Sequence, residues 1–233
     1  MSEQITDEFT KLIEDGYVNV NVVESPFGEK IISISDDRGD DKFSFSRKQI
    51  DQVKEFINEY EDIILASHEL NDKYTGIELA WEIGDTANEY LKNNNLSNKK
   101  FTLLTNLGYS ETYTHQMRNL PKVFPDKEYN EEYFTKSTIC ELTNTVSPET
   151  ARVVNDNANN YEITVDVHKV RAIRDIYNSP DGLENSVKKA MGRETFKSKS
   201  VDNLTDVLYD AHLLLDYKDT SKHDIRELIK QNM

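Results

Sequence analysis

The spacing of helix caps and helix stops after Ser97 limits the fold more than any other feature of the sequence. Short amphipathic stretches alternate there with short polar connections, which is typical of small packed helices. The 233-residue chain contains only 8 Gly and 5 Pro, so few residues interrupt helices. The pattern predicts helices at residues 101–107, 111–123, 138–144, 148–157, 165–177, 180–191, 201–215 and 222–231.

Residues 17–45 follow a different pattern, with two β-rich runs on either side of a turn at Pro26 and Gly28. A second turn, DDRGDD, leads into the strictly alternating run KFSFS. These three runs predict a three-stranded antiparallel meander. Ser46 is a good N-cap for a long helix, and another helix is expected from about Thr75. The predicted fold class is therefore α+β, mostly α, with the meander and its helix followed by a helical region.

The order of these elements predicts four parts of the chain. A small acidic α+β domain is expected at residues 1–72 and a helical domain at residues 73–180. A basic linker at 181–200 then leads to a C-terminal helical pair at 201–233. The first helix of this pair has an apolar stripe that suits either core packing or a homodimer interface, formed by Leu204, Val207, Leu208, Ala211, Leu214 and Leu215.

The formal net charge of −15 is concentrated near the N-terminus. Residues 1–97 contain 9 basic and 22 acidic side chains, whereas residues 98–178 contain 10 and 11, and residues 179–233 contain 9 and 10. A surface that binds nucleic-acid phosphates is therefore expected beyond residue 97. The order of elements in residues 17–65 resembles the whirly type of single-stranded-DNA-binding protein, but the acidic charge favours a packing or dimerisation domain there.

Sequence signals for membrane insertion and for catalysis are missing. No apolar run approaches the roughly 18 residues of a membrane span, and the polar, acidic N-terminus lacks a secretory signal pattern. We therefore expect a cytoplasmic protein without a membrane partner. There is no phosphate-binding glycine motif, no histidine pair at three- or four-residue spacing, and only one cysteine. The sequence predicts no catalytic residue, no metal site and no cofactor, and hence no enzyme.

Residues 101–125, FTLLTNLGYSETYTHQMRNLPKVFP, are the basis of the functional hypothesis. Gly108 can end a short amphipathic helix, and Ser110 can cap the next one. This order of a short helix, a glycine turn and a capped second helix is typical of a helix-turn-helix. We therefore predict that residues 101–123 bind double-stranded DNA.

The polar side of the second helix is rich in the hydrogen-bond donors that a recognition helix directs at base edges and phosphates. Gln116 and Asn119 suit adenine, and Arg118 suits guanine or phosphate. Pro121 is expected to bend or end the helix after about three turns. The predicted DNA-binding residues here are Ser110, Thr112, Thr114, His115, Gln116, Arg118, Asn119 and Lys122.

A second segment, residues 147–175, adds to this hypothesis. Ser147 and Pro148 can begin one helix, and the next helix has four further predicted DNA-binding residues: His168, Lys169, Arg171 and Arg174. The arrangement STICELTNTVSPETARVV, followed by ITVDVHKVRAIR, resembles the helical region after the helix-turn-helix of ParB- and KorB-like partition proteins. It is also similar to helix-turn-helix proteins of phages and plasmids.

The resemblance covers about residues 75–178 and implies binding of double-stranded DNA by a helical module. The nuclease-like N-terminal motifs of ParB proteins are missing, so partition activity and nucleotide hydrolysis are not implied. The expected function is a regulator, or an accessory factor of replication or partition. The alternative is an acidic inhibitor or DNA mimic in which residues 1–97 bind a protein partner.

Overall fold

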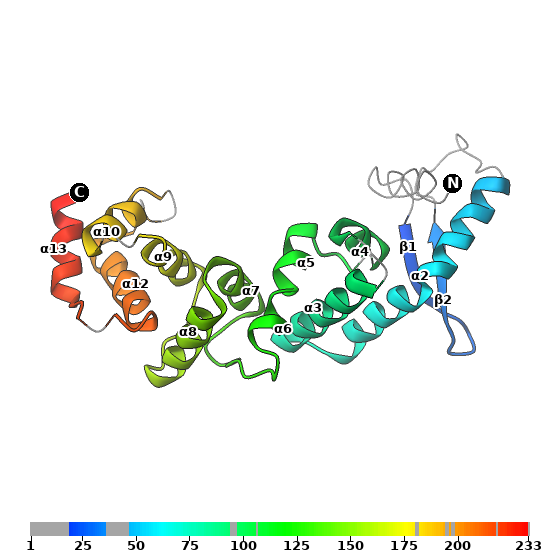
Figure 1. Cartoon of the computed structure of the whole chain (residues 1–233), viewed down its shortest axis with the longest axis horizontal. Coiled ribbons are helices and arrows are strands. Elements are labelled where there is room, and N and C mark those ends of the chain that lie inside the picture. The colour runs from blue at the N-terminus through cyan, green and yellow to red at the C-terminus, as the bar shows by residue number, and fades with distance from the viewer. Residues whose placement is uncertain are drawn as a thin grey trace. The chain divides into compact units, whose positions relative to one another are not determined.

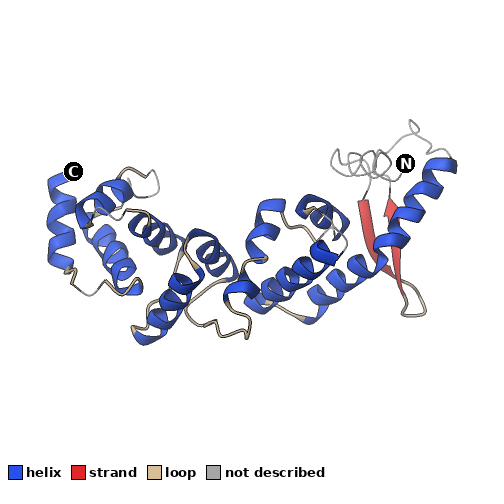
Figure 2. Ribbon diagram, viewed as in Figure 1, coloured by secondary structure: helices blue, strands red, loops and turns tan. Residues whose placement is uncertain are grey.

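A computed structural model describes residues 19–35, 47–93, 97–105, 107–179, 182–193, 196, 199–217 and 219–232. Most of these residues form helices joined by short connections (Figures 1 and 2). The described residues up to Arg118 form one compact unit, and those from Asn119 form a second. The boundary between the two units falls inside the predicted helical domain at 73–180, so each unit is described separately.

The first unit begins with a hairpin of β1 (Asn19–Glu24) and β2 (Lys30–Ser35), which pair antiparallel. Gly28 closes the connecting turn with a φ of 80°, a conformation that glycine adopts without steric cost. The hairpin lies against the long helix α2 (Arg47–Lys73), as Figure 1 shows. An ion pair of 3.0 Å between Lys30 Nζ and Asp72 Oδ2 joins the hairpin to that helix.

The predicted α+β class with a three-stranded meander was wrong. Within the described residues, the only sheet is the two-stranded hairpin, and every other element is a helix (Figure 2). The predicted third strand, KFSFS, lies outside the described residues. Alternating β-formers identify two strands, but local propensity does not decide the class of a fold, because burial against neighbouring elements does. Here the neighbour of the hairpin is a 27-residue helix.

The remainder of the first unit is a three-helix group of α3 (Gly76–Asn93), α4 (Asn98–Thr105) and α5 (Glu111–Met117). Its core contains Ile83 of α3, Phe101 of α4 and Met117 of α5, each at most 1% exposed. On α3 the buried side chains Ile77, Ala80, Ile83, Ala87 and Leu91 recur at three- and four-residue spacing, so burial of one face of this helix drives the packing.

Four helices of the second unit, α7, α8, α9 and α12, have N-termini that are capped by side chains. Thr135 forms a capping box with Thr138, and Ser147, Asp166 and Ser200 accept hydrogen bonds from backbone N–H groups. The described helices of this unit are α6 (Leu120–Val123), α7 (Lys136–Thr145), α8 (Pro148–Asn160), α9 (Val167–Tyr177), α10 (Leu183–Met191), α12 (Val201–Leu214) and α13 (Lys222–Asn232).

The apolar stripe of α12 lies in the core of the second unit. All six of its members are at most 9% exposed, because α12 packs against α8, α9 and α13. A buried ion pair adds a polar contact nearby, since the Arg193 guanidinium donates two hydrogen bonds to the Asp175 carboxylate, which is 1% exposed. The stripe therefore supplies core packing within the chain.

Candidate nucleic-acid interface

The connection between α4 and α5 has the predicted helix-turn-helix features. Gly108 has a φ of 75°, and Ser110 is the N-cap of α5, where its Oγ accepts a hydrogen bond of 3.2 Å from Tyr113 N. The Asn98 side chain, at the start of α4, donates to the carbonyl of Glu111 at 2.9 Å. Both the glycine turn and the cap are confirmed, and the contact from Asn98 ties the starts of the two helices together.

The second helix is shorter than the sequence predicts. A single helix was expected at residues 111–123, but α5 ends at Met117 and α6 begins at Leu120. Pro121 explains the break, because it has no N–H to donate to the carbonyl of Met117, four residues earlier, and its ring would clash with that carbonyl. The candidate recognition helix therefore has about two turns.

The carbonyl of Met117 lies instead against Gly84 of α3. A Cβ added to Gly84 would be 2.1 Å from Met117 O and 2.7 Å from Met117 C. Only a residue without a side chain fits at this point. The approach seats the last turn of α5 directly on the backbone of α3.

Three polar residues of α5 occur at positions i, i+3 and i+4, which lie on one side of a helix. Thr112 and His115 are exposed, and Gln116 is half-buried. Thr114 was also predicted on the outer side, but it is only 3% exposed and its hydroxyl donates to the Ser110 carbonyl at 3.1 Å. It lies three residues before the buried Met117, and this spacing was the signal for an inward position.

Arg118 is bound to α3 rather than projecting freely. Its Nε donates to Asn88 Oδ1 at 3.0 Å, and Asn88 Nδ2 donates to the carbonyl of Arg118 at 2.8 Å. Burial lowers the pKa of the Arg118 guanidinium. Asn88 was not singled out from the sequence, because the two residues are 30 positions apart and no local pattern connects them.

Two further predicted residues of this segment belong to the second unit. Asn119 Nδ2 donates to Asn144 Oδ1 at 2.7 Å, and the exposed Lys122 donates through Nζ to Asn119 Oδ1 at 3.2 Å. Within the first unit, the structure brings together Ser110, Thr112, His115 and Gln116.

The predicted residues of α9 divide into two pairs. The half-buried His168 ring lies 5.8 Å from the Phe196 ring, and Lys169 Nζ forms a 3.2 Å ion pair with Asp210. Arg171 and Arg174 are half-exposed and three residues apart. In the described part of the chain, neither guanidinium has an ion pair.

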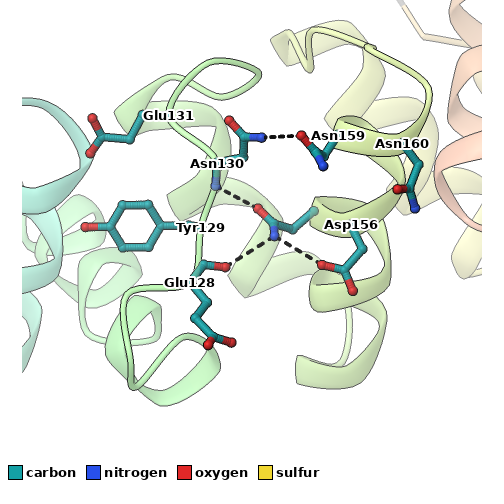
Figure 3. A pocket seen from close by; sticks show the side chains of 8 residues that line it. Glu128, Tyr129, Asn130, Glu131, Asp156, Asn159 and Asn160 are labelled. Carbon is teal, nitrogen blue, oxygen red and sulfur yellow. Dashed lines mark hydrogen bonds between the residues drawn. The ribbon is translucent and has the colours of Figure 1, made fainter.

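A polar depression of about 510 Å³ occurs beside α8 in the second unit (Figure 3). Asn155 organises it by accepting from Asn130 N at 2.9 Å and donating to the Glu128 carbonyl at 3.3 Å. Glu128, Glu131 and Asp156 give its wall a negative charge, which disfavours phosphate. This depression was not predicted from the sequence, although the asparagine-rich end of α8 lines it.

Comparison with known proteins gives no further information about the site. No family model, no curated protein and no solved structure matches this chain. None of the described helices is long and apolar enough to cross a membrane. Among the described side chains, no three His, Cys, Asp or Glu residues are grouped so that they could hold a metal ion.

Proposed function

We propose that this chain is a non-catalytic protein that binds double-stranded DNA with α5 in the major groove. The arrangement of α4, the turn at Gly108 and the capped α5 supports the proposal, because α5 is seated on α3 and its Thr112 and His115 side chains remain exposed. In this role, the protein is a cytoplasmic regulator, or an accessory factor of replication or partition.

The chemistry of the exposed side of α5 suits base edges. The major groove is about 12 Å wide and admits one helix. The Thr112 side chain offers a hydroxyl for hydrogen bonds and a methyl group for thymine, and the His115 ring offers a donor or an acceptor. Local charge is also favourable, because residues 98–118 contain three basic side chains and one acidic side chain, in contrast to residues 1–97.

Contacts to the DNA backbone require additional cations, since Arg118 is engaged by Asn88. Arg171 and Arg174 in the second unit are the best candidates among the predicted residues, because no described acidic side chain neutralises them. Lys122 is exposed and adds a third positive charge in that unit. Phosphate contacts of this kind supply affinity without reading sequence.

Fluorescence anisotropy with duplex and single-stranded DNA over a salt titration tests the proposal. We expect duplex to bind more tightly, with an affinity that falls steeply as salt rises. The double variant Thr112→Ala/His115→Ala should lose about 1–3 kcal/mol per base contact, whereas His223→Ala, an exposed histidine on α13, should bind as the wild type does. Absence of binding to any DNA at low salt would refute the proposal.

A second candidate function is supported by the acidic charge of the first unit. Glu59, Glu61, Asp62 and Glu69 are all exposed on α2, and such a surface can occupy the basic nucleic-acid groove of a protein partner. This function requires the acidic side chains of α2 and not Thr112 or His115. Charge reversal at Glu61 and Asp62 therefore separates the two candidates, because it should leave binding by α5 intact.

A further inference from the structure

The hydrogen bonds between Asn88 and Arg118 close a reciprocal pair at the end of α5. The side chain of Arg118 donates to Asn88 at 3.0 Å, and the side chain of Asn88 donates back to the Arg118 carbonyl at 2.8 Å. Asn88 lies one helical turn after Gly84, which contacts Met117. Two successive turns of α3 therefore hold two successive residues at the end of α5.

We propose that Arg118 is a positioning residue of the DNA-binding site, which sets the orientation of α5 on α3 and does not itself contact DNA. This inference rests on the proposed function. It also assigns to Asn88 a role in DNA binding, although Asn88 lies on α3 and not on the recognition helix.

The short length of α5 explains why such a pair is needed. A helix of seven residues is not stable by itself, because its few hydrogen bonds do not offset the unfavourable free energy of helix nucleation. The carbonyls of the last turn also lack helical partners, and Asn88 supplies one for Arg118. The position of Thr112 and His115 in a groove depends on this interface, and contacts of this kind tolerate only about 0.5 Å of misplacement.

Two substitutions of Arg118 separate positioning from contact with DNA. In Arg118→Gln, the amide nitrogen occupies the same place along the side chain as Nε, so the hydrogen bond to Asn88 can form without a charge. In Arg118→Lys, the charge is kept, but no nitrogen remains at the place of Nε. Positioning predicts that the glutamine variant binds DNA nearly as the wild type does and that the lysine variant is weaker. Contact with a phosphate predicts the reverse order.

The full chain should be tested by anisotropy with duplex DNA, and by chemical unfolding without DNA. We expect Arg118→Ala to weaken binding by about tenfold or less, and Asn88→Ala to weaken it at least as much, because Asn88→Ala removes both hydrogen bonds and Arg118→Ala only the one from Nε. The double variant should bind no more weakly than Asn88→Ala alone. The dependence of the logarithm of affinity on the logarithm of salt should keep its slope in all variants. Unfolding should show the same coupling between the two positions.

The possible failures are distinguishable. If the wild type binds duplex DNA but Arg118→Gln loses affinity together with about one unit of salt slope, Arg118 contacts a phosphate and the inference is wrong. Additive losses in the double variant would also overturn it. If the wild type binds no DNA, the proposed function fails and this inference fails with it. If the substitutions at Asn88 and Arg118 are then still coupled in their effects on unfolding, the two residues only stabilise the fold.

Discussion

Replacement of Gly84 by alanine tests the packing that holds α5 on α3. A Cβ at this position would lie 2.1 Å from the carbonyl oxygen of Met117, and real Cβ atoms essentially never come closer than 3.0 Å. The two helices must therefore separate by about 0.9 Å. The neighbour is backbone, so no rotation of a flexible side chain can relieve the contact.

The expected loss of stability follows from two opposing effects. Overpacking of this kind costs about 1–3 kcal/mol, and the upper end applies because a backbone carbonyl must move. Alanine gains about 1 kcal/mol over glycine within a helix. The net loss for the first unit is therefore about 2 kcal/mol. Because the shift moves α5, the affinity for duplex DNA should fall as well.

Tryptophan fluorescence during urea unfolding measures this change in the first unit. The chain contains a single tryptophan, Trp81, which lies on α3 one turn before Gly84. Gly192→Ala is the control, followed by circular dichroism because Gly192 lies in the second unit; Gly192 has a helical φ of −66° and a Cβ there would meet no atom closer than 3.5 Å. The control should be neutral or slightly stabilising. An unchanged or higher urea midpoint in Gly84→Ala would refute the close approach of α3 and α5.

Two further predictions concern the second unit, and circular dichroism in urea measures both. Asp175→Asn should lower its free energy of unfolding by about 3 kcal/mol, because it leaves Arg193 without its buried partner; a loss below about 1 kcal/mol would show that the pair matters little. Burial lowers the pKa of His212 to about 4, so the folded unit disfavours the protonated ring. Its stability should therefore be full above pH 6.5 and fall as the pH drops toward 4, by up to about 3 kcal/mol, and His212→Gln should remove that part of the pH dependence.

Local signals in the sequence located most of the helices. Ser110 and Ser147 were recognised as caps because their side chains satisfy N–H groups only two or three residues away, so the pattern is short enough to see. The helix expected at 148–157 extends to Asn160, and the one expected at 165–177 begins at Val167. Such errors at the ends arise because helix ends fray and their signals are weak.

The parts that were not predicted depend on contacts between distant residues. Asn88 and Arg118 meet because α3 and α5 pack, and neither residue alone signals a partner. The expected third strand rested on alternation alone, which does not show which strands pair. Gly84 was a missed signal, since a glycine within an amphipathic helix often marks the close approach of another backbone. The exposed Thr112 and His115 of α5 could be predicted from the sequence, but the contacts of α5 with Gly84 and Asn88 of α3 could not.

In this acidic chain, the salt-dependent part of DNA affinity and the recognition of bases are expected to come from different side chains. Thr112 and His115 can discriminate between bases, but a hydrogen bond to a base edge neutralises no phosphate and therefore releases no counterions from DNA. Arg118 is engaged by Asn88, so the salt-dependent part of the affinity must come from other cations. Arg171→Ala/Arg174→Ala should therefore lower the salt slope by about 2, whereas Thr112→Ala/His115→Ala should lower affinity with the slope unchanged. If both double variants keep the salt slope of the wild type, α9 does not contact DNA and this prediction is wrong.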